Sequence, residues 1–169
     1  MKNKCIWFLG LSGAGKSTLS TLLKDKISKN EKVIVLDGDV LRTGLNNNLG
    51  FTDEDRIENG RRTAEAAKLF LAEGYWVLVA LITPLDQMRE NNRKILGGSY
   101  FEIFVDTPLS VCQQRDPKGL YSKVASNQIQ NFTGVSAPFD IPKEADLAIF
   151  TKDKNPEECV EEIYQIIFS

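Results

Sequence analysis

The chain has 169 residues, of which 42% are apolar and 26% charged, and its net charge is −2 at pH 7. This length fits one domain, residues 1–169, that can bury a substantial core. The near-zero charge argues against bulk electrostatic binding to nucleic acid or to an anionic membrane. No apolar run reaches the roughly 20 residues of a membrane span, and the N-terminus lacks the apolar region of a signal peptide. We therefore expect a cytoplasmic protein.

The cysteines and the absence of histidine limit which disulfides, metal sites and general bases the chain can contain. Cys5, Cys112 and Cys159 are odd in number and far apart, which fits neither a disulfide framework nor a zinc site. We expect three buried thiols. The chain contains no histidine, so a general base must be a carboxylate, a lysine or the substrate itself.

Apolar runs alternate with helical patterns along the whole chain. The expected strands are Cys5–Leu9, Val33–Leu36, Trp76–Ile82, Phe101–Val105 and Leu147–Phe150. The expected helices are Lys16–Ser28, Asp53–Glu73, Leu85–Leu96, Leu109–Gln114 and Glu157–Ile167. Short strands that are apolar throughout and alternate with helices predict an α/β fold, with a parallel five-stranded sheet and helices on both faces. In such sheets ligands bind at the carboxyl ends of the strands.

Capping signals mark several of the helix starts. Thr52 precedes three acidic residues, and Thr83, Thr107 and Asn155 each stand directly before a proline. A hydroxyl or amide side chain followed by proline or acidic residues is typical of a helix N-terminus. We expect these four residues to cap the helices that follow them.

The first strand leads into Gly10-Leu11-Ser12-Gly13-Ala14-Gly15-Lys16-Ser17, which precedes the first helix. Glycines allow positive φ and a close approach of the backbone to an anion. The N–H groups at the start of the helix then face that negative charge. Lys16 would reach the β- and γ-phosphates and the Ser17 hydroxyl would bind Mg²⁺. We interpret this segment as a phosphate-binding loop (P-loop).

Two carboxylates follow the second strand, in Asp37-Gly38-Asp39. Beside a P-loop, one of them could orient Mg²⁺ through its waters and one could accept a proton from an attacking hydroxyl. The alternative is structural, with Asp37 as a turn former and Asp39 as the N-cap of a short helix. The third strand ends without an aspartate, which favours Asp37 as the carboxylate on the metal side.

The segment before the second long helix carries a possible recognition surface. Arg56 and Asn59 are three residues apart on one helical face, within reach of a common anionic ligand. The alternative is a solvated charged face. Phe51 follows a glycine just before the helix and is either a core residue or a platform for a base.

Several blocks together resemble the adenylylsulfate (APS) kinase family of P-loop kinases. They are Gly10–Thr18, Leu36–Leu45, Leu49–Asn59, Phe104–Tyr121 and Asn131-Phe132-Thr133-Gly134, and their order and spacing run through nearly the whole chain. The resemblance implies a P-loop NTPase-type fold with a mobile lid at about residues 115–134. It also implies a phosphotransferase that moves the γ-phosphoryl group of ATP, with Mg²⁺, to the 3′-hydroxyl of adenylyl sulfate. Members of the family are generally homodimers.

The resemblance assigns roles residue by residue. Expected to bind ATP are Gly13, Ala14, Gly15, Lys16, Ser17, Thr18, Arg115 and Lys154, with Ser17 and Asp37 at the metal. Expected to bind the acceptor are Asp39, Arg42, Phe51, Arg56, Asn59, Ile82, Thr83, Lys118, Asn131 and Phe132. Phe51 and Phe132 match the aromatic pair that sandwiches the acceptor base. Lys16, Asp37, Arg56 and Lys118 are the expected catalytic residues.

Four positions depart from the family's usual pattern. Val40 and Thr43 replace an asparagine and a His/Gln, and Leu85 and Asp86 replace an aromatic residue and an arginine. These positions fall on or near the acceptor side, so the acceptor is open to an alternative. A branch of the family phosphorylates cytidine diphosphoramidate in capsule decoration, and a cytidine 5′-diphospho derivative is the second candidate. A third possibility is a regulatory domain that binds nucleotide without turnover.

Overall fold

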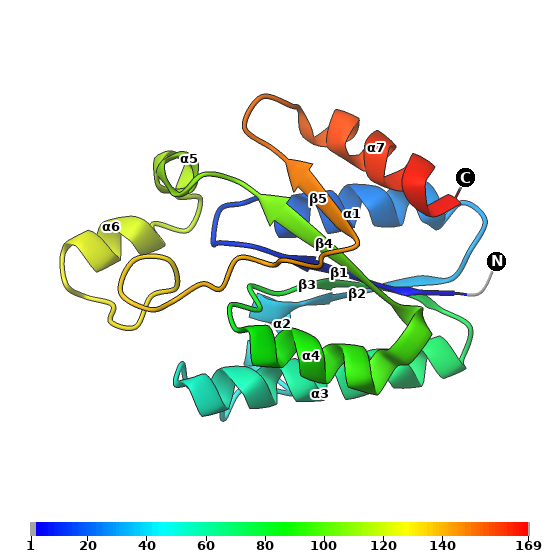
Figure 1. Ribbon diagram of the computed structural model, residues 1–169, viewed down its shortest axis with the longest axis horizontal. Coiled ribbons are helices and arrows are strands. Elements are labelled where there is room, and N and C mark those ends of the chain that lie inside the picture. The colour runs from blue at the N-terminus through cyan, green and yellow to red at the C-terminus, as the bar shows by residue number, and fades with distance from the viewer. Residues whose placement is uncertain (1–2, 169) are drawn as a thin grey trace.

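A computed structural model describes residues 3–168 of the chain (Figure 1). All five strands form one parallel sheet in the order β2-β3-β1-β4-β5. The strands are β1 (Cys5–Leu9), β2 (Val33–Asp37), β3 (Trp76–Ala80), β4 (Tyr100–Asp106) and β5 (Leu147–Phe150). The expected α/β fold with a parallel five-stranded sheet is confirmed.

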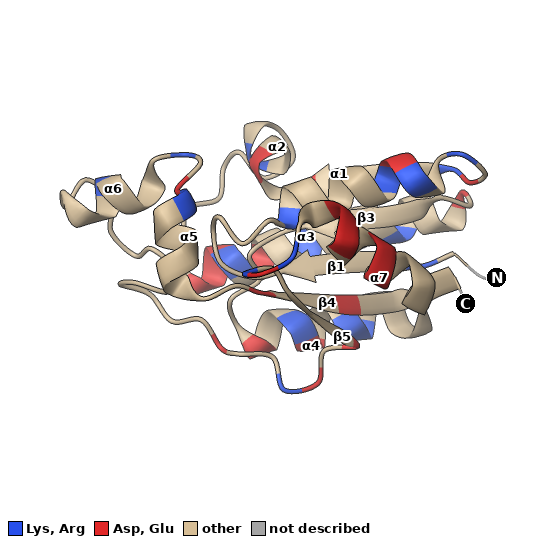
Figure 2. Ribbon diagram, turned by 90° about the horizontal axis from the view of Figure 1, so that it is seen from above, with Lys and Arg blue, Asp and Glu red and all other residues tan. Residues whose placement is uncertain are grey.

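Helices cover both faces of the sheet. They are α1 (Lys16–Ile27), α2 (Gly38–Thr43), α3 (Asp53–Ala72), α4 (Asp86–Leu96), α5 (Leu109–Arg115), α6 (Leu120–Ala125) and α7 (Pro156–Phe168), with a 3-10 turn at Gly97–Ser99. In Figure 1, α1 and α7 lie on one face and α3 and α4 on the other. Helices α5 and α6 lie beyond the carboxyl ends of the strands, where a site is expected. In Figure 2, acidic residues colour α7, whereas α1 and α4 carry both basic and acidic residues.

The central strand β1 is buried on both faces, and this burial explains why its sequence is apolar at every position. Ile6 and Phe8 point into the core beneath α1 and α7, whereas Cys5, Trp7 and Leu9 point into the core beneath α3 and α4. All five residues are fully buried. A strand buried on both faces needs apolar side chains at every position.

Most element boundaries agree with the sequence to within two residues. The sequence missed α2, α6 and the 3-10 turn, because elements of three to six residues carry too few turns to show a periodicity. Strand β3 ends at Ala80, not at Ile82. Residues 81–84 form an irregular segment that lines the site described below.

Two of the four expected caps are confirmed. The Thr52 hydroxyl accepts a hydrogen bond from Asp55 N at 3.2 Å, and Asn155 Oδ1 accepts from Glu158 N at 2.8 Å. The other two were wrong. Helix α4 begins after Leu85 and α5 after Pro108, so Thr83 and Thr107 are not caps, and both are buried with their hydroxyls bonded in the interior.

The three cysteines are free and buried, as expected. Burial raises the pKa of each thiol above its ordinary value. Across residues 3–168, no helix combines the length and the apolar character that crossing a membrane requires.

Candidate active site

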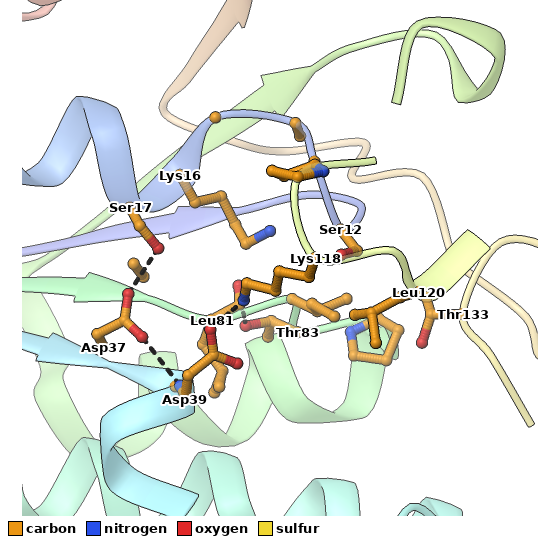
Figure 3. Close-up of a pocket in the computed structure, with 18 of the residues that line it drawn as sticks. Ser12, Lys16, Ser17, Asp37, Asp39, Leu81, Thr83, Lys118, Leu120 and Thr133 are labelled. Atoms are coloured by element: carbon orange, nitrogen blue, oxygen red, sulfur yellow. Dashed lines mark hydrogen bonds and ion pairs between the residues drawn. The ribbon is translucent and has the colours of Figure 1, made fainter. Parts of the chain in front are cut away.

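A cavity of about 930 Å³ opens at the carboxyl ends of the strands (Figure 3). Its lining brings together the P-loop, the Asp37–Asp39 turn, the start of α3, the segment after β3 and the segment 115–134. Every residue that the sequence predicted for ATP, metal or acceptor binding lines this cavity. Lining residues up to 147 positions apart in sequence, Ser12 and Cys159, therefore meet at one place.

The P-loop has the conformation that its glycines suggest. Gly13 and Gly15 have φ values of 77° and 109°, in the region that glycine adopts without a steric penalty. Gly10 packs so closely on β4 that a Cβ atom there would lie 2.7 Å from Val105 O. Helix α1 has no side-chain cap and no acidic residue in its first turn, so its first N–H groups remain available to an anion.

Lys16 is buried at the floor of the cavity. Its Nζ donates a hydrogen bond to Leu11 O at 2.7 Å. Burial and, to a smaller extent, the positive charge of Lys118 lower the pKa of Lys16 to about 8, although Cys112, Asp39 and Asp37 act in the opposite direction. A bound phosphate group would place a negative charge beside Lys16 and so favour its ammonium form.

Ser17 and Asp37 form the oxygen-rich part of the site. Ser17 Oγ donates to Asp37 Oδ2 at 2.6 Å, and Asp37 Oδ1 accepts from Asp39 N at 2.9 Å (Figure 3). Asp37 is thus the N-cap of α2 and also faces the P-loop. The alternative in which Asp39 is the N-cap was wrong, because Asp39 lies inside the first turn of α2 and pairs with Lys118.

Phe51 lines the cavity and is exposed. The guanidinium carbons of Arg42 and Arg56 lie 4.3 Å and 5.9 Å from the centre of its ring. Its exposed fraction of 59% excludes a core role in this structure. Two cations beside one ring help to hold that ring by cation–π attraction.

Arg56 connects the start of α3 to the segment 131–133. Its Nε donates to Phe51 O at 3.0 Å, and its two Nη atoms donate to Thr133 Oγ1 and Asn131 O, both at 2.8 Å. Phe132 lies between these two partners, with its ring edge-on to Tyr121 at 5.0 Å between centroids. The solvated-face alternative for Arg56 was wrong, because only 7% of the residue is exposed.

Asn59 is buried one turn along α3. Its Oδ1 accepts a hydrogen bond from Asn46 Nδ2 at 2.7 Å. This bond turns the Asn59 amide so that its nitrogen is the group left for a ligand. The sequence analysis missed Asn46, because nothing in the local pattern indicates a partner 13 residues away.

The segment 115–134 contacts the P-loop, Thr151 and Asp39. Arg115 donates to Thr151 O at 2.9 Å and to Gly13 O at 3.4 Å, Tyr121 OH donates to Ser12 O at 2.9 Å, and Lys118 pairs with Asp39 across the cavity. Lys154 lines the cavity and pairs with Glu162 of α7.

The four residues that depart from the family pattern are close in sequence to residues that line the cavity, but they do not line it themselves. Val40 is 67% exposed, and Thr43 Oγ1 donates to Val40 O within α2. Leu85 packs on the core beneath α3 and α4, and Asp86 pairs with Arg89. The sequence placed these four positions on or near the acceptor side, and in the structure their side chains lie outside the cavity lining.

Thr133 and Thr151 also line the cavity, but neither was assigned a role from the sequence. A threonine hydroxyl beside better-marked residues carries no distinct local signal. The Thr107 and Thr151 hydroxyls both donate to Ala14 O, at 3.1 and 3.3 Å, and so support the P-loop from below.

Comparisons with known proteins agree with this geometry. The family model for Adenylylsulphate kinase matches residues 2–150. An adenylyl-sulfate kinase of Bacteroides thetaiotaomicron is 46% identical over 164 residues, which are 96% of this chain and 82% of that protein.

Solved structures give the same result. The structure of the Mycobacterium tuberculosis APS kinase CysC in complex with AMPPNP and APS has a TM-score of 0.95 and 43% identity, and the match covers 99% of both chains. A hexameric APS kinase from Thiobacillus denitrificans has a TM-score of 0.71 and 26% identity, over 97% of this chain and 29% of that one. By sequence and by structure, the chain belongs to the adenylylsulphate kinase family.

Proposed function

We propose that the protein is an ATP-dependent kinase that phosphorylates the 3′-hydroxyl of adenylyl sulfate, producing 3′-phosphoadenylyl sulfate and ADP. One observation carries the proposal. One cavity is lined both by a P-loop with a buried lysine and by an exposed phenylalanine that lies beside two arginines. A phosphoryl donor and an aromatic acceptor can therefore occupy it together.

In this proposal the chain contributes mainly positioning and charge. Lys16 and the N–H groups at the start of α1 bind the β- and γ-phosphates and neutralise the charge that moves during transfer. Phe51 and Phe132 hold the acceptor base by stacking, with Arg42, Asn59, Ile82, Thr83 and Asn131 around it. Closure of residues 115–134, through Arg115 and Lys118, excludes water that would otherwise compete for the γ-phosphoryl group.

Ser17 and Asp37 are the residues that would hold Mg²⁺. A hydroxyl and a carboxylate are hard oxygen donors that lie together beside the P-loop, which is the donor type that Mg²⁺ prefers. Among the described residues no cluster of three or more His, Cys, Asp or Glu side chains is present, consistent with a metal held largely by phosphates and water. Bound Mg²⁺ supplies charge neutralisation at the β- and γ-phosphates. In this proposal Asp37 would also accept the proton of the attacking hydroxyl.

The acceptor choice rests on where the departures from the family pattern fall. Val40, Thr43, Leu85 and Asp86 do not line the cavity, so no lining residue argues for a cytidine 5′-diphospho acceptor over adenylyl sulfate. Both relatives with high coverage reported above are named for adenylyl sulfate.

The test is a coupled ADP-release assay with adenylyl sulfate, CDP, cytidine diphosphoramidate and adenosine at matched concentrations. We expect the highest kcat/KM with adenylyl sulfate. A higher kcat/KM with a cytidine compound would overturn the acceptor and leave the kinase chemistry standing. ATP binding without turnover of any compound would support the regulatory alternative.

We further propose that the chain acts as one catalytic domain whose residues 115–134 form a mobile lid. We also propose a homodimer, on the strength of the family resemblance, and a cytoplasmic location, where ATP is supplied. Light scattering after size exclusion tests the dimer, for which a single species of twice the 18.9 kDa chain mass is expected.

A further inference from the structure

The segment 81–84 that follows β3 has an unusual backbone. Thr83 has a φ of 50° and is fully buried. A positive φ in a β-branched residue is a genuine outlier, because Cβ clashes with the backbone, and such strain persists only where surrounding contacts hold it. Ile82, Thr83 and Pro84 all line the cavity.

Hydrogen bonds hold every carbonyl oxygen of this segment. Leu81 O accepts from Thr83 Oγ1 at 3.2 Å, and Ile82 O accepts from Gly10 N at 3.3 Å. Pro84 O accepts from Asp140 N at 2.8 Å. The remaining carbonyl, that of Thr83, accepts from Arg89 Nη1 at 3.1 Å.

Two main-chain N–H groups of the segment keep no partner within residues 3–168. They belong to Ile82 and Thr83, and of these two residues only Ile82 is partly exposed. Because Thr83 is fully buried, the main chain of this wall offers a ligand at most the Ile82 N–H as a donor, while its carbonyl acceptors are all occupied. If the Thr83 carbonyl lost its hydrogen bond to Arg89, the wall would contain an unpaired acceptor. Polar groups of a binding site that a ligand leaves unpaired discriminate strongly between ligands.

Arg89 lies behind this wall on α4. Only 4% of it is exposed, and it is not part of the cavity lining. Besides Thr83 O, its guanidinium donates to Asp140 O at 2.8 Å and pairs with Asp86. Asp86 N in turn donates to Asp140 Oδ2 at 3.0 Å. The guanidinium thus joins the segment after β3 to the loop at residue 140.

We propose that Arg89 is a positioning residue for the acceptor: it holds Thr83 in its left-handed conformation and so shapes the wall against which the acceptor nucleotide binds. Asp86, which stands where the family commonly has an arginine, supplies the opposite charge that keeps this guanidinium in place. The inference rests on the proposed function for the identity of the acceptor. It adds a residue that touches neither substrate.

Arg89→Lys is the primary test, with Arg93→Lys as the matched control. Lysine keeps the charge, but a single ammonium cannot reproduce the fork that spans two carbonyl oxygens. Arg93 lies one turn further along α4, contacts Glu102 and Glu144 O at 3.4 Å, and has no contact with the wall. Asp86→Asn, at an exposed position, loosens Arg89 without altering a buried side chain.

Two readouts decide the inference. Loss of one positioning hydrogen bond should raise the KM for adenylyl sulfate about tenfold in Arg89→Lys. The KM for ATP should stay unchanged, with a smaller shift in the same direction in Asp86→Asn and none in Arg93→Lys. The backbone NMR chemical shifts of Thr83, which report its φ, should move in Arg89→Lys and not in Arg93→Lys.

The outcomes separate this inference from the proposed function. An unchanged acceptor KM in Arg89→Lys, equal changes for ATP and acceptor, or unmoved Thr83 shifts would overturn the positioning role. If Arg89→Lys does not fold, Asp86→Asn gives the same decision through its own KM and Thr83 shifts. Wild-type protein that fails to phosphorylate adenylyl sulfate would overturn the proposed function alone, because the Thr83 measurement needs no acceptor.

Discussion

At the scale of single residues, Lys16 and Asp37 each combine a structural contact with a position in the cavity. Lys16 donates to the carbonyl of Leu11, inside the same loop, and Asp37 caps α2 while accepting from Ser17. In both cases the contact fixes the side chain before any ligand binds. Groups that are held in place beforehand need no reorganisation during the reaction.

The lowered pKa of Lys16 predicts pH-dependent ATP binding. Burial favours the neutral amine, so in the free protein Lys16 loses its proton as the pH rises through about 8. Phosphate favours the ammonium form, so ATP binding should take up a proton and its affinity should fall by up to about tenfold per pH unit above that pKa. Calorimetry in buffers of different ionisation enthalpy measures both quantities. Lys16→Met should bind ATP more weakly and lose this pH dependence.

The lowered pKa of Lys16 also predicts how the free energy of unfolding changes with pH. The unfolded chain keeps the Lys16 proton until its ordinary pKa of 10.5, whereas the folded chain releases it near 8. Between these two values the unfolded state binds more protons, so the Lys16 contribution to the free energy of unfolding rises with pH across that window. The difference in the free energy of unfolding between wild type and Lys16→Met isolates this contribution. A difference that falls as the pH rises would contradict the lowered pKa of Lys16.

Asp37→Asn separates a chemical role from a structural one. Asparagine caps a helix as well as aspartate does, so α2 should keep its N-cap and the Tm should change little. A lost proton acceptor or metal orienter acts mainly in the transition state, and kcat should fall by about 10²–10⁴-fold with little change in acceptor KM. Asp25→Asn, at an exposed position of α1, is the control. Unchanged kcat with a lowered Tm would leave Asp37 as a capping residue only.

At the scale of elements, the acceptor end is assembled by contacts between segments. Arg56 on α3 donates to Phe51 O on one side and to Asn131 O and Thr133 on the other. These bonds set the separation of the Phe51 and Phe132 backbones. The start of α3 and the segment 131–133 therefore form one unit.

The aromatic pair gives a prediction for this unit. Phe51→Ala should weaken acceptor binding by about 1–3 kcal/mol, the value of one lost base stack, and leave ATP binding unchanged. Phe132→Ala should do the same with some loss of stability, because its ring also packs on Tyr121. Phe150→Ala is a matched control, since Phe150 is as exposed as Phe51, at 59%, and lies outside the cavity lining. Calorimetric losses that are equal for both ligands would argue against stacking.

At the scale of the whole molecule, stability comes from two cores, one on each face of the sheet. The core beneath α1 and α7 includes Ile6, Leu23 and Ile163, and the core beneath α3 and α4 includes Trp7, Val79 and Met88. Ile82, Thr83 and Lys16 lie where the sheet ends and not within either core. Met88 belongs both to a core and to the cavity lining, whereas Leu23 belongs to a core alone, so packing can be perturbed at Leu23 without changing a lining residue.

Leu23→Ala tests that separation. Leu23 is fully buried in α1, and truncation of a buried leucine should lower the free energy of unfolding by about 2–5 kcal/mol. The KM values of the folded protein should not change. Leu69→Ala, at a helical position that is 72% exposed, should stay within about 0.5 kcal/mol of wild type. Chemical denaturation measures both, and equal effects would contradict the burial of Leu23.

The sequence by itself determined the α/β class and the P-loop. Both depend on short-range patterns, namely apolar runs, glycine spacing and the order of strands and helices, which act within a few residues of each other. The resemblance to a known family supplied the assigned site residues, all of which line the cavity, but it did not supply Thr133 or Thr151. Parallel connections then bring the loops at the strand ends together, so Ser17 and Asp37 were predicted at one site before their contact was seen.

Only the tertiary structure decided how that lining is held. Thr83 adopts a left-handed conformation and bonds to Arg89, Asn46 bonds to Asn59, and Arg56 bonds to Thr133. These three hydrogen bonds join residues that are 6 to 77 positions apart. Thr83 before a proline has the local pattern of a helix cap, and packing around Trp7 and Arg89 overrides that preference. A buried polar group needs a partner, but the sequence does not specify which one, because the partner is chosen by three-dimensional proximity.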